Sequence, residues 1–375
     1  MKYNITCLYS LFLLLPLFSF ANSLNEDVGN NWPLTLESSN SFDVASKCEM
    51  LVFIEVFNDY DVLSDTDLAQ RIKVKVPKAK LESITQWKKD TKARLIANFT
   101  KLSDASLKDV ICVNNNSTWE VLSAIALESD MPANFVAWYK ATQVFYTDYI
   151  GEQLRLAALF PKITSEILQF SENEIQGHNF IDKHFLLTFD DGPTAVNGNT
   201  DKLIKVLNNY DLTGQFFVLG ENLEQRLNAT SKEAVKQLYG DNKVFSHGKV
   251  HKAHQKYDLW KTSIDYTSAL INKIYPENND KLVYFRPPYG QRNTAMTDYF
   301  TEKDSKIILW NIDSRDWSSK LNVQQVADRQ IKLMLLWRHG ILLFHDIHTK
   351  VQKVVPIIHN YFKNTSIVWM TPDAI

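Results

Sequence analysis

The stretch that decides the fold is a short apolar run that ends in two adjacent carboxylates, Phe185-Leu186-Leu187-Thr188-Phe189-Asp190-Asp191-Gly192-Pro193. The apolar part indicates a buried strand, because Gly-Pro cannot continue a ladder and a helix would need more residues. Two neighbouring carboxylates repel each other, and one of them stays ionised only where a cation or an arginine lies nearby. The plain alternative is a polar turn after a strand, and the residues downstream decide between the two.

Length and composition are those of an ordinary globular protein. The chain has 375 residues, enough for two domains, of which 45% are hydrophobic and 22% are charged. A formal net charge of -2 gives no electrostatic argument for binding nucleic acid or an anionic membrane surface. We therefore expect no nucleic-acid partner, and the sequence indicates no particular protein partner.

The first residues are typical of an export signal. Lys2 precedes an apolar run from Leu8 to Phe20, and Ala21 offers a small residue at the cleavage position. The run is short for a membrane-spanning helix, which needs about 20 apolar residues. We expect residues 1–21 to be a signal peptide and the mature chain to be exported to the periplasm, the cell surface or the medium without stable membrane insertion. An uncleaved anchor is the alternative.

Three cysteines are present in the sequence. Cleavage of the signal would remove Cys7 and leave Cys48 and Cys112, which an oxidising compartment would allow to pair. The sequence does not show whether the two backbones approach closely enough for a disulfide.

Residues 41–170 have a helical pattern and carry no catalytic constellation. Apolar side chains recur at helical spacing in two stripes, Leu81, Ile84, Leu95, Phe99 and Leu102 in one and Phe135, Trp138, Thr142, Phe145 and Tyr149 in the other. We expect both stripes to be core; Trp87, Trp119 and Trp138 could face a glycan, but burial is the expectation. A polar segment, 171–183, follows. We place a domain boundary there, with a mainly helical region of unassigned role at 22–175 and a catalytic domain at 176–375.

Downstream of the boundary, strands alternate with helices, a pattern that predicts β/α units and a parallel sheet. The expected helices include 200–210, 259–274 and 323–337, and the expected strands are 185–189, 215–219, 243–246, 282–285, 306–312, 340–344 and 366–370. This number of strands in so short a segment suggests a closed or nearly closed barrel. The active site should then lie beyond the carboxyl ends of the strands.

His247 and His251 follow the third expected strand. Histidines four apart on a helical turn point the same way and can share one metal ion. A carboxylate from another strand end would complete a His-His-carboxylate site with positions open for water and substrate, and either Asp190 or Asp191 can supply it. His254 is a rival ligand, which we rank second and expect at the rim of the site.

Three more strand ends carry residues of catalytic type. The fourth strand is followed by Arg286-Pro287-Pro288-Tyr289-Gly290, the fifth by Asp313-Ser314-Arg315-Asp316-Trp317, and the sixth ends in Leu343-Phe344-His345. Each segment alone would be unremarkable. Five strand ends in succession with residues of this kind are hard to explain by structure alone.

This ordered set resembles the five motifs of the polysaccharide deacetylase family, also called carbohydrate esterase family 4, which share the NodB homology domain. The matching motifs are Thr-Phe-Asp-Asp-Gly-Pro, His-x-x-x-His, Arg-Pro-Pro-Tyr-Gly, Asp-x-x-Asp-Trp and Leu-x-His, and they span about 180–375. The resemblance implies a distorted (β/α)7 barrel after the mainly helical N-terminal region. It also implies a metal-dependent hydrolase that removes acetyl groups from N-acetylated sugars of a polysaccharide or oligosaccharide.

The resemblance assigns the metal ligands by matching positions. Asp191, His247 and His251 would bind one divalent ion, usually zinc, with cobalt or another divalent ion as the alternative. One departure from the family pattern is Gly248, where many members have a serine or threonine whose hydroxyl steadies the loop. We expect the missing hydroxyl at position 248 to affect the rigidity of this loop more than metal binding.

The remaining motif residues receive catalytic and binding roles in the same way. Asp190 would be the general base, held ionised by Arg286, and His345 would be the general acid, tuned by Asp316. The residues that would contact substrate are Tyr289, whose backbone N–H would help form the oxyanion hole, and Trp317 and Leu343, which would shape the pocket for the acetyl methyl group.

The chemistry of amide hydrolysis fits these roles. An acetamide is a poor electrophile, and a bound metal polarises its carbonyl and lowers the pKa of bound water from 15.7 to about 7. The amine leaves only after protonation, which requires an acid such as His345. The expected substrate is an acetylated glycan: chitin-like, peptidoglycan or exopolysaccharide. The alternatives are an O-deacetylase similar to acetyl xylan esterases and a non-catalytic glycan-binding module.

Overall fold

The computed structural model describes residues 31–375 except 76–77, 104–117, 129–132, 162–163 and 165–166. The expected signal peptide, Cys7 and Cys112 lie outside the described residues. Cys48 is buried, and burial raises the pKa of its thiol to about 12. No helix in the described part of the chain is long and apolar enough to cross a membrane.

The first half of the chain is helical, as expected. Its helices are α1 (Ser39–Asp61), α2 (Asp65–Arg71), α3 (Lys78–Phe99), α5 (Trp119–Glu128) and α6 (Val136–Leu159), and the short 3-10 helix η1 (Ala133–Phe135) precedes α6. Ser38 caps α1 through a reciprocal pair of hydrogen bonds with Ser41. Trp87 and Trp138 are buried, so the prediction that they are core residues is confirmed.

The second half contains a parallel sheet with β2 at its centre. The ladder order is β4-β3-β2-β7-β6, β8 also pairs with β2, and β1 pairs with β5 in a separate two-stranded ladder. The strands are β1 (Glu174–Ile175), β2 (His184–Asp190), β3 (Gln215–Val218), β4 (Lys243–Ser246), β5 (Ile307–Ile308), β6 (Ile312–Asp313), β7 (Gly340–His345) and β8 (Val368–Trp369). Every ladder is parallel. The class predicted from the sequence, an α/β fold with a parallel sheet, is therefore confirmed.

The ladders among the described residues do not close into the expected seven-stranded barrel. The fourth expected strand is reduced to single bridges from Phe285 to Ser246 and Ile307. The proline pair Pro287-Pro288, one residue further along the chain, lacks the N–H groups that a longer ladder would need. The fifth expected strand is divided into β5 and β6. A closed barrel remains a prediction.

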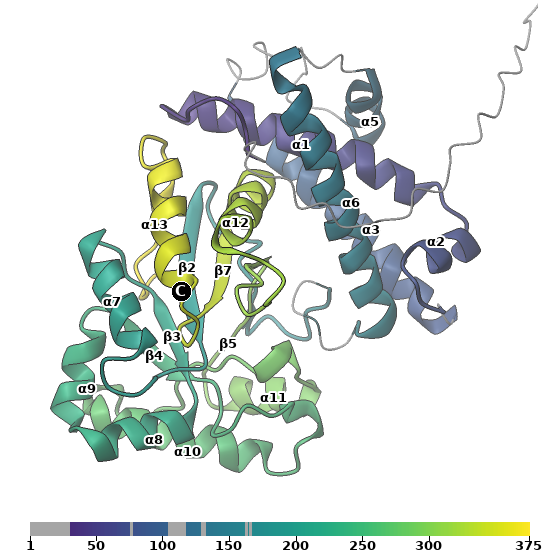
Figure 1. The fold of residues 1–375 in the computed structure, drawn as a ribbon. Coiled ribbons are helices and arrows are strands. Elements are labelled where there is room, and N and C mark those ends of the chain that lie inside the picture. The colour runs from purple at the N-terminus through teal and green to yellow at the C-terminus, as the bar shows by residue number, and fades with distance from the viewer. Residues whose placement is uncertain (1–30, 76–77, 104–117, 129–132, 162–163, 165–166) are drawn as a thin grey trace, which may run out of the picture.

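Helices surround the strands on several sides (Figure 1). They are α7 (Asn199–Asn209), α8 (Gly220–Ala229), α9 (Lys232–Tyr239), α10 (Trp260–Ile274), α11 (Thr294–Glu302), α12 (Val323–Trp337) and α13 (Val351–Phe362), with short 3-10 helices η2 (His254–Lys256), η3 (Pro276–Asn278) and η4 (Pro288–Gly290). The N-terminal helices gather beside α12, whereas α7 to α10 lie on the other side of the sheet (Figure 1).

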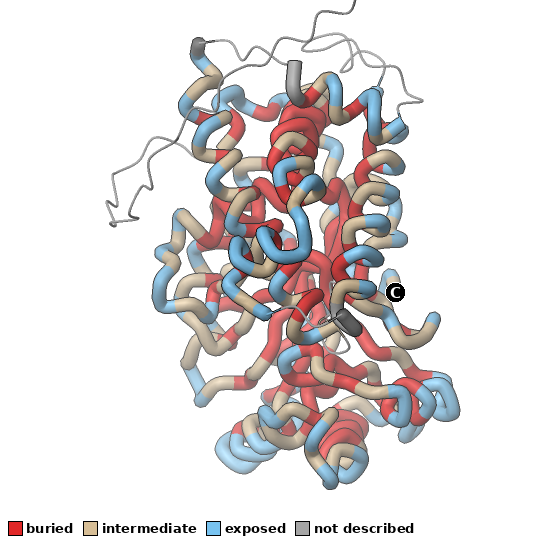
Figure 2. Tube along the Cα trace, turned by 90° about the vertical axis from the view of Figure 1, so that its right-hand side faces the viewer, coloured by how far each residue is buried: buried red, intermediate tan, exposed pale blue. Residues whose placement is uncertain are grey.

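The N-terminal helices pack closely against α12. Ser46 Oγ donates a hydrogen bond to the carbonyl of Leu335 (2.6 Å), and Lys332 Nζ reaches Thr142 Oγ1 (2.7 Å) and Glu49 Oε1 (3.3 Å). One apolar cluster includes residues of both halves, and buried segments run through the centre of the molecule (Figure 2). The predicted boundary at 175/176 falls directly after β1, and the division into two domains stays a prediction.

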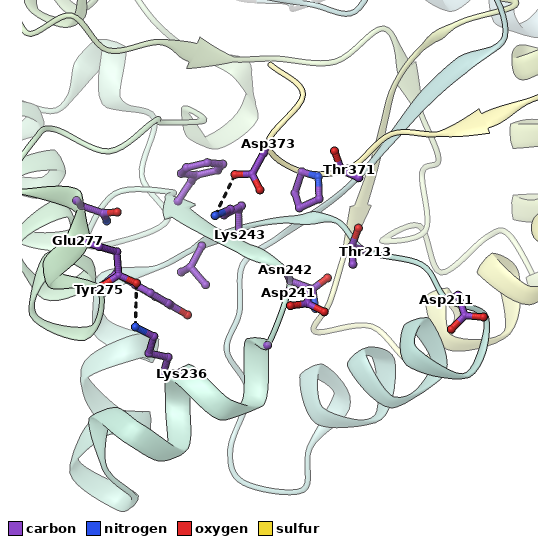
Figure 3. A pocket seen from close by; sticks show the side chains of 15 residues that line it. Asp211, Thr213, Lys236, Asp241, Asn242, Lys243, Tyr275, Glu277, Thr371 and Asp373 are labelled. Atoms are coloured by element: carbon purple, nitrogen blue, oxygen red, sulfur yellow. Dashed lines mark hydrogen bonds and ion pairs between the residues drawn. The ribbon is translucent and has the colours of Figure 1, made fainter.

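A cavity of about 540 Å³ lies at the amino ends of β3 and β4 (Figure 3). Two ion pairs lie in its lining, Lys243 with Asp373 (2.9 Å) and Lys236 with Glu277 (2.8 Å). Because the predicted catalytic residues follow the carboxyl ends of the strands, this cavity lies at the opposite edge of the sheet from them.

Candidate active site

Asp191, His247 and His251 form a group whose ligand atoms lie within 4.8 Å of one another. Asp191 follows the last residue of β2, and His247 follows the last residue of β4. Asp191 Oδ1 lies 3.4 Å from Nε2 of each histidine. The backbone of Asp191 is left-handed, with φ 81°, a strained conformation that is most common at functional sites.

This group has the arrangement expected of a metal site. His247 Nδ1 donates a hydrogen bond to the carbonyl of Arg286 (2.7 Å), which leaves Nε2 without a proton and directed at Asp191. Burial lowers the pKa of His247 well below its usual value, so the ring is neutral. Asp191 Oδ1 is buried and accepts no hydrogen bond from any described residue. Two neutral nitrogens around an unpaired carboxylate oxygen fit a divalent cation.

Asp190, the last residue of β2, has a different environment from its neighbour. Its Oδ1 accepts a hydrogen bond from the fully buried guanidinium of Arg286 (2.8 Å), and its Oδ2 lies 3.9 Å from His247 Nε2. Burial raises the pKa of Asp190 to about 6, and the charge of Arg286 limits the rise. Arg286 is held by Thr188 Oγ1 and by the carbonyls of Ile308 and Leu309. A carboxylate that is ionised near neutral pH therefore faces the Asp-His-His group.

His345, which is partly exposed, and the buried Asp316 form a pair beside Asp190. His345 is opposite Asp190 in the register of β7 with β2. Its Nδ1 lies 2.8 Å from Asp316 Oδ1, and its backbone N–H donates to Asp316 Oδ2 (2.9 Å). A carboxylate only accepts, so Nδ1 carries a proton. Burial by itself lowers the pKa of His345, but attraction and hydrogen bonding from Asp316, with further attraction from Asp190 and Asp191, raise it to about 10.

Of the three residues expected to contact substrate, Tyr289 lies against this group. Tyr289 has a left-handed backbone (φ 61°), and its exposed ring packs edge-on against His251, with ring centroids 4.5 Å apart. Trp317 is half exposed, and Leu343 is buried in β7 beside the strand residues of the site. The fold thus brings Asp190, Asp191, His247, His251, Arg286, Tyr289, His345 and Asp316 into one connected group, and the roles of all ten predicted residues stay predictions.

His254 does not lie where we expected it. It is fully buried instead of lying at the rim, and it does not belong to the group formed by the other two histidines. Its Nδ1 donates to the carbonyl of Lys252 (2.7 Å), and its Nε2 lies 3.0 Å from Ser263 Oγ. Ser263 in turn accepts the N–H of Lys249 (2.7 Å), inside the loop that joins His247 and His251. The rival ligand is therefore part of the support of the loop.

The same contact accounts for Gly248. Its φ is +79°, and a Cβ at this position would lie 2.5 Å from Nε2 of His254. A side chain does not fit there, because the imidazole occupies the space and Ser263 provides the hydroxyl that holds the loop. This explains the departure from the serine or threonine of many family members.

Sequence reasoning missed Asp346, which follows His345 directly. It is fully buried, and Thr200 Oγ1 donates to its Oδ2 (2.8 Å). Burial raises its pKa to about 8, with further contributions from Asp191 and Asp190. A Cβ at Gly192 would lie 2.0 Å from Asp346 Oδ2, so the turn after the two aspartates needs glycine. The position of Asp346 directly after His345 was the feature of the sequence that could have pointed to it.

The comparisons with known proteins agree with the motifs. Residues 177–307 match the family described as "Polysaccharide deacetylase". A Bacillus cereus protein named peptidoglycan-N-acetylglucosamine deacetylase is 30% identical over 133 residues, which cover 35% of this chain and 45% of that protein. A second Bacillus cereus protein of the same name is 28% identical over 181 residues, which cover 46% of this chain and 63% of that protein. The chain spans less than two thirds of the length of either relative.

A solved structure, that of the Bc1960 peptidoglycan N-acetylglucosamine deacetylase in complex with an N-oxidanyl-benzamide, is 21% identical. The match covers 53% of this chain and 95% of that one, with a TM-score of 0.44. The parallel α/β fold places at the strand ends an Asp-His-His group that could hold a metal ion. The segment 177–307, which includes the motifs at Asp190-Asp191, His247 and Arg286, is similar to the polysaccharide deacetylase family.

Proposed function

We propose that this protein is a metal-dependent deacetylase that removes acetyl groups from N-acetylated sugars of a glycan. The observation that carries the proposal is the position of Asp191 Oδ1, which is buried, accepts no hydrogen bond from the described residues and lies 3.4 Å from Nε2 of both His247 and His251. A buried carboxylate oxygen in this state is costly unless a cation pairs with it.

Asp191, His247 and His251 would hold the metal ion, for which zinc fits the nitrogen and oxygen donors best. When bound, the ion supplies Lewis-acid activation of water and of the acetyl carbonyl. The group is buried at His247 and exposed at His251, so it is accessible to solvent and substrate from one side.

Asp190 would act as the general base. Its Oδ1 is engaged by Arg286, so its Oδ2 is the atom available to take a proton from water. The guanidinium keeps this carboxylate oriented and favours its ionised form. The backbone N–H of Tyr289 would donate to the oxyanion that forms at the carbonyl, and one such donor is typically worth about 3 kcal/mol.

His345 would act as the general acid. The hydrogen bond to Asp316 fixes Nδ1 as protonated and holds the ring in place, so Nε2 is the nitrogen that can give a proton to the departing amine. The raised pKa of His345 keeps the ring charged at neutral pH. Asp190 and His345, opposite each other on β2 and β7, would act on the two sides of the same acetyl group.

The names of the relatives support an N-acetylglucosamine polymer such as peptidoglycan as the substrate. A yeast chitin deacetylase and bifunctional xylanase/deacetylases are also among the relatives, so related proteins differ in the polymer that they are named for. We further propose that the chain is exported, on the basis of the signal-like residues 1–21.

The test is incubation of the purified protein with peptidoglycan, chitin oligomers, acetylated exopolysaccharide and acetylated xylan. Released acetate and the mass loss of the glycan are measured before and after removal of metal. We expect acetate release from at least one N-acetylated glycan that stops on chelation. No release from any of them, with the metal content verified, would contradict the proposal.

A further inference from the structure

We propose that helix α6 of the N-terminal region is part of the active-site structure, because Glu152 on this helix positions Arg315 and with it the loop that carries Asp316 and Trp317. This inference deepens the proposed function and rests on it. It also gives the helical region, which carries no catalytic motif, a role in the reaction.

The contact is an ion pair between the two halves of the chain. Arg315 donates a hydrogen bond from its terminal guanidinium nitrogen to Glu152 Oε2 (2.7 Å), and the two side chains are 32% and 28% exposed. Asp148, one turn earlier on α6, is close enough to feel the charge of Arg315. Residues four apart share one face of a helix, so Asp148 lies on the same face of α6 as Glu152.

The loop is strained at the residue that Glu152 holds. Arg315 has a left-handed backbone, with φ 57°, which residues other than glycine seldom adopt. Its N–H donates to Asp313 Oδ1 (2.8 Å), which forms a tight turn. A conformation of this kind persists where surrounding contacts determine it, and the ion pair to α6 is one such contact.

A second route joins α6 to the same loop. Arg329 of α12 donates from Nε to the carbonyl of Asp313 (2.8 Å), and its guanidinium lies over the ring of Tyr149 of α6, 5.5 Å from the centroid. The loop is therefore attached to α6 by the side chain of Arg315 and by Arg329. Helix α6 would have to move, or be absent, for the loop to relax.

The loop that contains Arg315 also contains Asp316, which contacts the candidate acid, His345. Asp316, the residue after Arg315, accepts both the N–H and the Nδ1–H of His345. Trp317, the next residue, is 51% exposed, and the Arg315 guanidinium lies 5.8 Å from its ring centroid. A displacement of Arg315 is passed through one or two peptide bonds to Asp316 and Trp317. Glu152 is thus a positioning residue, which acts through Arg315 without touching the reacting atoms.

The experiment compares wild type, Glu152→Gln and Arg315→Lys in the full chain. Glu277→Gln is the control, because it disrupts an ion pair of similar length with Lys236 at the amino ends of β3 and β4, at the opposite edge of the sheet from the candidate site. Hydrogen exchange of the backbone N–H groups of residues 315–317 reports on the loop without any need for activity. We expect up to about five-fold faster exchange in both variants and no change in the control, since a partly exposed ion pair has a modest effect.

Kinetics on an N-acetylglucosamine oligomer give the second measurement. We expect kcat to fall several-fold in Glu152→Gln, and the exchanged pair, Glu152→Arg with Arg315→Glu, to recover part of the loss in both measurements. Unchanged exchange in Glu152→Gln overturns the inference, as does faster exchange with kinetics equal to those of the control. If wild type releases no acetate from any glycan, the proposed function fails, and hydrogen exchange alone then decides whether Glu152 holds the loop.

Discussion

The two adjacent aspartates provide the sharpest test of the site, because the same substitution, aspartate to asparagine, should change the metal content at one position and leave it unchanged at the other. Asp191→Asn changes the carboxylate that lies 3.4 Å from both histidines. Asp190→Asn changes the carboxylate that accepts from Arg286 at 2.8 Å. An asparagine has the same shape as aspartate but carries no charge, so each variant removes charge with little change in packing.

The expected magnitudes follow from these contacts. Asp190→Asn leaves the buried guanidinium of Arg286 without its counter-charge, which costs up to about 3–5 kcal/mol, and less where the amide oxygen still accepts the hydrogen bond. Loss of the general base lowers kcat by about 10² to 10⁴. Metal content should remain near that of wild type. Asp191→Asn leaves the Asp190 to Arg286 pair intact but removes the charged ligand, so metal content should fall.

The assay combines three measurements on each variant: metal content by elemental analysis, acetate release from an N-acetylglucosamine oligomer, and the free energy of unfolding in urea. Correct folding is checked by circular dichroism before kinetics. If Asp190→Asn lost its metal while Asp191→Asn kept it, the roles of the two carboxylates would be exchanged and the reasoning from Arg286 would be wrong.

Three further outcomes are expected. Chelation should abolish acetate release and added zinc or cobalt should restore it; full turnover by a sample that elemental analysis shows to be metal-free would contradict the metal site. His345→Ala should nearly eliminate hydrolysis of N-acetylated sugars but retain a much larger fraction of aryl acetate hydrolysis, because a phenolate leaves without a proton; equal fractional losses, at unchanged metal content, would reject the acid role. Gly248→Ala should lower the urea midpoint of unfolding more than Gly240→Ala. Both glycines have positive φ, but only a Cβ at Gly248 would meet another side chain, His254 Nε2 at 2.5 Å. Equal shifts of the midpoint would show that the His254 ring moves aside without a cost in stability.

The positions of the catalytic side chains follow largely from the sequence. One buried strand ends at Asp190-Asp191, and two further strands end near His247 and His345. These residues can be assigned to one site without knowing the register of the strands. Parallel strands place their carboxyl ends at one edge of a sheet, so residues that follow successive strands are brought together by topology alone. The helical stripes of the first half were predictable for a similar reason, since their period is local.

The tertiary structure decided what no local pattern contains. From the residues alone the two aspartates were equivalent candidates for a metal ligand; in the structure the buried guanidinium of Arg286 lies beside Asp190, whereas Asp191 lies beside the two histidines. His254 was expected at the rim, because the spacing of residues along the chain does not show how deeply a side chain is buried. In the structure His254 is buried, and its ring lies against Ser263. The break between β5 and β6 likewise depends on which neighbours are present at each point along the strand.

The ion pair between the helical region and the loop after β6 is the clearest case of a feature decided only by folding. Glu152 and Arg315 are 163 positions apart, and neither lies in a pattern that marks the other. Local sequence determines periodicity, strand ends and turns, because these depend on a few neighbouring residues. Contacts between distant segments depend on how whole layers pack. The sequence therefore determined which residues meet at the strand ends, and only the packing of α6 decided that Glu152 contacts Arg315 in the loop after β6.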